Sequence, residues 1–144
     1  MAAETPLSKR PSPVPDTDSA PYWEACREHR LTAQRCAGCG RFRWPPAGVC
    51  SHCQQRGGEW TTLRGTGRLT SYVVAQRAIH PAFADKVPYT IAFVALDEAP
   101  DDLVIVSNLI DVPGEEVRVG MPVQVTFEDL PDGASLPLFR RVEA

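Results

Sequence analysis

Four cysteines in two closely spaced pairs constrain this chain more than any other feature of its sequence. They are Cys36, Cys39, Cys50 and Cys53. Each pair has the spacing C-x-x-C, and a loop of ten residues separates the pairs. Two such turns can direct four thiolates at one point, which gives the tetrahedral ligand set that zinc prefers. We therefore expect one structural zinc ion, with Gly38 and Gly40 supplying the permissive backbone that a metal knuckle requires.

Iron in a rubredoxin-like centre is the alternative, because the same four ligands accept it. Four thiolates close the coordination sphere and leave no position for water or substrate, so the metal is expected to be structural and not catalytic. The fifth cysteine, Cys26, lies on the apolar stripe of an expected helix, where we interpret it as a small core residue. The acidic runs 97–102 and 128–132 are expected to be solvated loops.

The first twenty residues differ in composition from the rest of the chain. They contain four prolines and little apolar surface, so ordering them would cost more than packing returns. We expect a disordered, Pro-rich tail over 1–20, an N-terminal helix and metal ribbon over 21–64, and a β-barrel over 65–144. The helix is expected at 21–29 because Pro21 suits a first helical turn, and a strand is expected at 31–35.

Five β-rich runs follow the cysteines, bounded by glycine and proline. They are 69–79, 89–96, 103–110, 121–127 and 138–142. The run 89–96 is apolar on both faces, as in a central strand, and the fourth run alternates, with Val123, Val125 and Phe127 on one face. Five short strands in about 75 residues favour a mainly β chain that ends in a five-stranded Greek-key barrel of the OB type. A turn or short helix is expected within 111–120.

Charge is distributed unevenly along the chain. The segment 27–77 has a net charge of +7 and the segment 84–144 a net charge of −8, although the whole chain is only at −3. A basic front half suggests a face that meets an anion, or a solvated arginine-rich surface. No stretch approaches the roughly 20 apolar residues that cross a bilayer, and no secretory signal is recognisable. We expect a cytoplasmic protein without membrane contact, in which paired cysteines are metal ligands rather than disulfides.

The order of these motifs closely resembles a known family. The C-x-x-C-G knuckle is followed by Trp44, Pro45 and Pro46, the barrel is entered through Gly65 and Gly67, and the run Gly120-Met121-Pro122 precedes the fourth strand. These features, over 22–142, resemble the acyl-CoA-associated OB-fold proteins with a rubredoxin-like zinc ribbon, known as domain-of-unknown-function family thirty-five. The resemblance implies that Cys36, Cys39, Cys50 and Cys53 are the metal ligands.

The resemblance also implies a function. Such proteins typically act as non-catalytic accessory subunits that dock on a thiolase-superfamily enzyme and help to hold or channel an acyl-CoA, in lipid or sterol side-chain metabolism. Five residues are candidates for the contact with CoA or with the partner: Arg41, Arg43, Trp44, Arg64 and Arg68. Trp44, Phe83 and Phe139 are the expected aromatic anchors of the interface.

Two other function classes are compatible with parts of this sequence. Zinc ribbons and OB barrels also bind nucleic acid, but a phosphate backbone is bound by Lys and Arg, and the barrel half of this chain is acidic. A nucleic-acid-binding module is therefore the alternative to the accessory subunit. For the third class, an independent enzyme, the sequence offers no recognisable set of catalytic residues.

Overall fold

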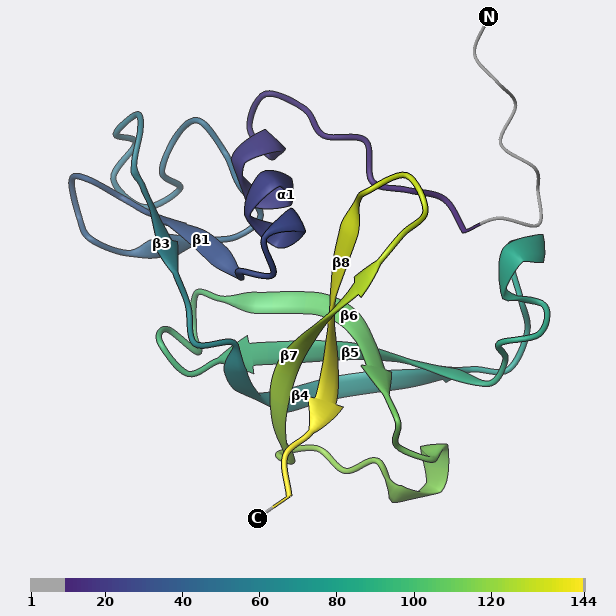
Figure 1. The fold of residues 1–144 in the computed structure, drawn as a ribbon. Helices are drawn as coiled ribbons and strands as arrows, with labels where there is room; N and C mark the ends of the chain where they lie inside the picture. Colours follow the sequence, from purple (N-terminus) through teal and green to yellow (C-terminus); the bar gives the residue numbers. More distant parts are fainter. Residues whose placement is uncertain (1–9, 144) are drawn as a thin grey trace, which may run out of the picture.

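The computed structural model describes residues 10–143 and consists of one helix, a small ribbon sheet and a barrel (Figure 1). The helix is α1 (Ala20–Arg27), and the ribbon strands are β1 (Thr32–Arg35), β2 (Phe42–Arg43) and β3 (Glu59–Thr62). The barrel strands are β4 (Thr66–Ala75), β5 (Tyr89–Leu96), β6 (Val104–Ile110), β7 (Pro122–Asp129) and β8 (Ser135–Arg141). Two 3-10 turns, η1 (Pro81–Phe83) and η2 (Gly114–Glu116), lie in the barrel connections. The mainly β fold class predicted from the sequence is confirmed.

Helix α1 has proline in its first turn, where a missing backbone N–H costs nothing. Its buried residues are Tyr22, Ala25 and Cys26, which lie three or four positions apart and so form one face. The helix ends when His29 adopts a left-handed backbone conformation with φ of 59°. The observed bounds lie one and two residues before the predicted ones.

The ribbon sheet has the order β2-β1-β3, and both pairings of the central β1 are antiparallel. The sequence predicted β1 but neither of its neighbours. Strand β2 has only two residues, and β3 is too short to show a periodicity that stands out from its surroundings. The chain between β1 and β3 holds the four predicted ligands.

The five later strands form a closed barrel in the order β4-β5-β6-β8-β7, as predicted for the OB type. Strand β5 pairs with both β4 and β6, which confirms that it is internal to the sheet. On β7, Val123, Val125 and Phe127 belong to the core cluster or pack against it, as the alternation predicted. The turn η2 lies inside the connection expected to carry one.

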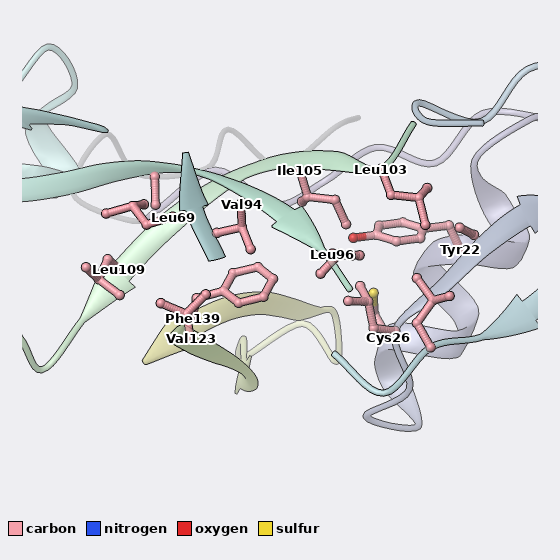
Figure 2. Close-up of a cluster of buried hydrophobic side chains, with 14 of the residues drawn as sticks. Tyr22, Cys26, Leu69, Val94, Leu96, Leu103, Ile105, Leu109, Val123 and Phe139 are labelled. Carbon is pink, nitrogen blue, oxygen red and sulfur yellow. The ribbon is translucent and has the colours of Figure 1, made fainter. Parts of the chain in front are cut away.

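The barrel and the N-terminal half share one hydrophobic core. In Figure 2 the side chains of Tyr22 and Cys26 on α1 approach Leu96 and Leu103, and the cluster continues through the barrel to Phe139. Leu31, Ala33 and Leu63 of the ribbon segment belong to the same cluster. The ribbon is therefore built onto the barrel core and is not an independent unit. Phe139 is fully buried in this core, so the expectation that it anchors an interface is wrong.

The N-terminal segment lies outside the helix and sheets. The disorder predicted for 1–20 falls partly on residues 1–9, which are outside the described residues, and for the remainder it stays a prediction. From Arg10 the described chain runs towards α1 without regular structure. Within residues 10–143, no helix is long and apolar enough to cross a membrane.

Candidate metal centre

The four predicted ligands converge at the tip of the ribbon. Their Sγ atoms all lie within 4.8 Å of one another. Two of the separations, 3.5 Å for Cys36–Cys53 and 3.7 Å for Cys39–Cys50, are close to the ~3.8 Å edge of a tetrahedron whose centre lies ~2.3 Å from each sulfur. The spacing of the thiols therefore fits a tetrahedral metal ion, and the four cysteines form a candidate metal site.

The two knuckles repeat one pattern of backbone hydrogen bonds. The N–H of Gly40 donates to the carbonyl of Cys36, and the N–H of Gln54 donates to the carbonyl of Cys50. Both donors lie four residues after the first cysteine of their pair, and both have positive φ, at 76° and 66°. The sequence predicted the permissive glycine of the first knuckle, whereas the second knuckle places a glutamine in the same conformation.

Backbone amides also aim at the sulfur atoms, which favours the thiolate form. The amides of Cys39 and Gly38 lower the pKa of Cys36 to about 6, and the N–H of Gly38 lies 3.3 Å from its Sγ. The amides of Cys53 and His52 likewise lower the pKa of Cys50. At Cys39 the amide of Arg41 acts in the same direction, but burial and the neighbouring thiols raise its pKa to about 11. A bound cation is the group that would allow all four sulfurs to be thiolates at once.

Cys26 lies apart from this site, in the shared core. Its side chain is fully buried, and burial raises its pKa to about 11, although a hydrogen bond from Tyr22 acts against the shift. The prediction that Cys26 is a core residue is confirmed.

Arg41, just before β2, and Arg43, within β2, have different surroundings. Arg41 is exposed, and its Nε lies 3.2 Å and its Nη2 2.5 Å from the Asp102 carboxylate of the β5–β6 connection. Arg43 is 7% exposed and donates to the Oε1 of Gln34 and the carbonyl of Gly57, both at 2.9 Å. Arg43 therefore holds the ribbon together internally.

The other three candidate contact residues lie elsewhere. Trp44 is half-buried, and its ring centre lies 4.6 Å from that of Tyr22. It lines a cavity of about 300 Å³, which none of the four candidate arginines (41, 43, 64 and 68) lines. The exposed guanidinium of Arg64 lies 3.7 Å from Glu98, and that of Arg68 donates to the carbonyl of Gly120. A contact of these residues with CoA stays a prediction.

Sequence reasoning missed the partners of these side chains. Asp102 and Glu98 belong to an acidic run that was expected to be a solvated loop, yet Asp102 is 15% exposed and binds the ribbon. Arg10 was placed in the tail, yet it contacts Glu128 and Asn108 on the barrel. A run of acidic residues does not indicate which of its side chains will face an arginine that is far away in the sequence.

Comparison with known proteins shows two family models that match this chain. A family model described as the rubredoxin-like zinc ribbon domain of ChsH2 matches residues 23–58, and one described as the C-terminal OB-fold domain of ChsH2 matches residues 60–128. The boundary between the two matches falls at the start of β3.

Individual relatives agree with the family models. A probable enoyl-CoA hydratase alpha subunit of Thermomonospora curvata is 37% identical over 139 residues, which are 95% of this chain and 41% of the relative. The chain thus spans about two fifths of the length of that relative. A DUF35 domain-containing scaffold protein of Pyrococcus furiosus is 30% identical over 105 residues, covering 72% of this chain and 74% of the relative.

A solved structure is similar in both sequence and shape. A chain of the Ltp2-ChsH2(DUF35) aldolase is 36% identical and superposes with a TM-score of 0.81 over 90% of this chain and 98% of that one. The family matches, the shared identity and the common ribbon-and-barrel fold agree with one another, and the chain belongs to the DUF35 family with a ChsH2-type zinc ribbon and OB-fold domain.

Proposed function

We propose that this chain is a non-catalytic accessory subunit that docks on a thiolase-like enzyme and helps to hold the acyl-CoA substrate. The observation that carries the proposal is the similarity to the chain of the Ltp2-ChsH2(DUF35) aldolase, which extends over 98% of that chain. The name of the Pyrococcus furiosus relative, a scaffold protein, points the same way. The ribbon and the barrel of that chain both have counterparts here, which supports the proposal.

The metal is proposed to be zinc in a structural role. Four cysteine ligands complete a tetrahedron, so an acyl-CoA would have no coordination position to occupy. The described knuckles match the rubredoxin-like zinc ribbon of the family, and iron is the competing ion because it accepts the same ligands. Elemental analysis of protein purified without added metal distinguishes the two, and about one zinc per chain is the expected result.

Arg68 is the best placed of the candidate arginines for an anionic group of CoA. Arg41 and Arg64 already face the carboxylates of Asp102 and Glu98, and Arg43 is buried. Among the described residues, the guanidinium of Arg68 has only a backbone carbonyl as its partner, which leaves other N–H groups free to bind phosphate.

The proposal is tested by mixing the purified chain with candidate thiolase-like proteins from the same organism. We expect a stable complex by size-exclusion chromatography with light scattering, and no turnover of acyl-CoA by the isolated chain. Arg68→Glu is expected to weaken binding of a CoA ester to the complex at least about tenfold by calorimetry, because charge-assisted phosphate contacts contribute roughly 1.5–3 kcal/mol. Arg56→Glu on the ribbon is the matched charge-reversal control.

Two outcomes would overturn the proposal. Turnover of an acyl-CoA by the isolated chain would rule out a purely accessory role. Failure to assemble with any thiolase-like protein would remove the docking function. Equal CoA affinity of the Arg68→Glu and Arg56→Glu complexes would leave the docking function standing and assign the CoA contact elsewhere.

A further inference from the structure

Arg10 is held on the barrel by three elements that are far apart in the sequence. Its Nη1 lies 3.2 Å from the Oε2 of Glu128 on β7, its Nη2 lies 3.4 Å from Asn108 on β6, and its guanidinium stands 5.4 Å from the ring centre of Phe83 in η1. The side chain is only 20% exposed. Its position is therefore defined by packing as well as by charge.

A second side chain of the same segment lies near the barrel. Ser12 is close enough to Asp132 in the β7–β8 turn to lower the pKa of that carboxyl group. The chain between Arg10 and α1 thus crosses the end of the β7–β8 hairpin, as the purple trace in Figure 1 shows. We call residues 10–19 the strap.

Arg10 of the strap borders the β6–β8 seam, which has the fewest paired residues of the barrel seams. Strands β6 and β8 are parallel and share only two register pairs, Leu109 with Phe139 and Ile110 with Arg140. Nearer the strap, a hydrogen bond from the Ser107 hydroxyl to the carbonyl of Pro137 links the two strands. Backbone groups of both strands along this part of the seam have no strand partner on the facing side.

Two cavities flank Arg10 along this seam. One, of about 210 Å³, is lined by residues that include Phe83, Lys86 and Tyr89. The other, of about 300 Å³, reaches the aromatic rings of Tyr22, Trp23 and Trp44. Both cavities are bordered by Arg10, Asn108 and Leu138, so Arg10 stands where the two would otherwise join.

We propose that Arg10 is a gate: while it is seated on Glu128 the seam holds two separate cavities, and when it swings away they join into one groove for an extended apolar chain with an anionic end. The apolar part of this ligand class follows from the aromatic and aliphatic lining. The anionic end follows from Lys86 at one end of the groove, where its Nζ lies 6.0 Å from the ring centre of Phe83, and the Glu128 carboxylate that lines the same cavity is the charge that opposes it. The inference does not depend on docking to an enzyme.

The gate is suited to opening because its closing contacts are individually weak. Glu128 is 41% exposed, and partly exposed ion pairs and cation–π contacts each contribute little to stability. The strap has no strand pairing that would have to break when Arg10 leaves. Release of the side chain therefore requires no unfolding of the barrel.

The test uses the full chain with its metal and the fluorescent probe N-phenyl-1-naphthylamine, which is apolar and uncharged, so that removing the charge of Arg10 or Glu128 does not by itself change its binding. Arg10→Ala and Glu128→Gln are each expected to increase the affinity for the probe at least about threefold, and decanoate is expected to displace it. Arg77→Ala is the matched control, since Arg77 is an exposed arginine of the β4–β5 connection.

The combined variant Arg10→Ala/Glu128→Gln should bind the probe no more tightly than either single variant, because both changes release the same contact. Hydrogen exchange should stay unchanged throughout the barrel strands, because release of the side chain requires no unfolding of the barrel. The gate is refuted if Arg10→Ala binds the probe as Arg77→Ala does, or if exchange in the barrel strands rises in Arg10→Ala. The assigned ligand class is refuted if decanoate fails to displace the probe.

Discussion

Arg43 has a different role from that of its neighbour Arg41. Both were predicted to present positive charge to a ligand, but Arg43 is buried among Gln34 and Gly57. A buried charged side chain whose partners stay in place is costly to remove, because the carbonyl it satisfied is left without a donor. The stability of the ribbon therefore depends on this arginine.

Arg43→Met is expected to lower the free energy of unfolding by about 1.5–3 kcal/mol, the loss that follows when a hydrogen-bonded charged group is removed from a buried site. Arg41→Met serves as the control and should cost less than about 1 kcal/mol, because its ion pair is partly exposed. Denaturant unfolding of both variants measures the difference. Equal losses of unfolding free energy in the two variants would show that the burial of Arg43 adds nothing to stability.

The thiols should react in two stages that reflect their two environments. With metal bound, almost none of the five cysteines should react with Ellman's reagent at pH 8, because four are ligands and burial holds the pKa of Cys26 at about 11. A chelator should expose four thiols and guanidinium the fifth. A fast native reaction that disappears in Cys26→Ala would contradict this assignment.

The raised pKa of Cys26 also has a consequence for stability against pH. The folded state favours the neutral thiol, with a pKa of about 11 against an ordinary value of 9.0. This contribution to stability is therefore complete below about pH 9 and is lost as the pH rises towards 11.

At the residue scale, spacing predicted the ligands and apolar periodicity predicted the burial of Cys26. Both are local patterns. The burial of Arg43 and Phe139 could not be predicted, because it depends on which side of a strand faces the core after distant segments pair. For Phe139 the last strand run began too late in the prediction, at 138 instead of Ser135, so too few residues remained to reveal its alternation.

Among the elements, the ribbon combines parts with two different sources of stability. Leu31 and Ala33, at the start of the ribbon, belong to the core shared with the barrel, whereas the loop that carries the cysteines contributes only partly buried side chains to it. Small loops without a core depend on their metal for order. Loss of the metal should therefore affect the two parts differently.

Removal of the metal with a chelator is expected to release amide protection over 36–58 while α1 and the barrel strands remain protected, as hydrogen exchange with mass spectrometry would measure. Cys53→Ser should give the same pattern, and Cys26→Ser should not. Loss of protection in α1 together with the loop would show that the shared core cannot hold the helix without the metal.

The elements differ in how well they could be predicted. The five barrel strands were found because each is a β-rich run bounded by Gly or Pro, with clear alternation in the fourth run and apolar residues on both faces of the second. Strands β2 and β3 were not found, because their pairing with β1 rests on contacts across the metal loop rather than on a pattern of their own. The turn η1 was missed for a different reason: it has only three residues, too few to show a helical period, and its cap is the His80 side chain, which accepts a hydrogen bond from the N–H of Ala82.

For the molecule as a whole, the uneven charge of the sequence is partly neutralised within the fold. The basic segment and the acidic segment meet in ion pairs between Arg41 and Asp102, and between Arg64 and Glu98. The basic front half suggested a face that binds an anion. Part of that negative charge is supplied by the acidic barrel of the same chain. Each pair is partly exposed, so the attraction orients the ribbon more than it stabilises it.

A double-mutant cycle of Arg41→Ala and Asp102→Asn is expected to give a coupling of about 0.5–1 kcal/mol near pH 7, which salt should reduce. The hydrogen bond from Arg41 lowers the pKa of Asp102 below its ordinary 3.8. The coupling should therefore persist above about pH 4 and disappear as the pH falls through the lowered value. A coupling of zero in low salt would show that the pair does not join ribbon to barrel.

The shared core also limits how such chains can be recombined. A chimera that joins the ribbon of one relative to the barrel of another would have to keep Leu31 and Leu63 packed in the cluster that they share with the barrel, or leave a void between the halves. The loop that carries the four cysteines, by contrast, could be exchanged between relatives as one segment. The natural crossover points of this fold therefore flank the metal loop and do not lie at the boundary between its two domains.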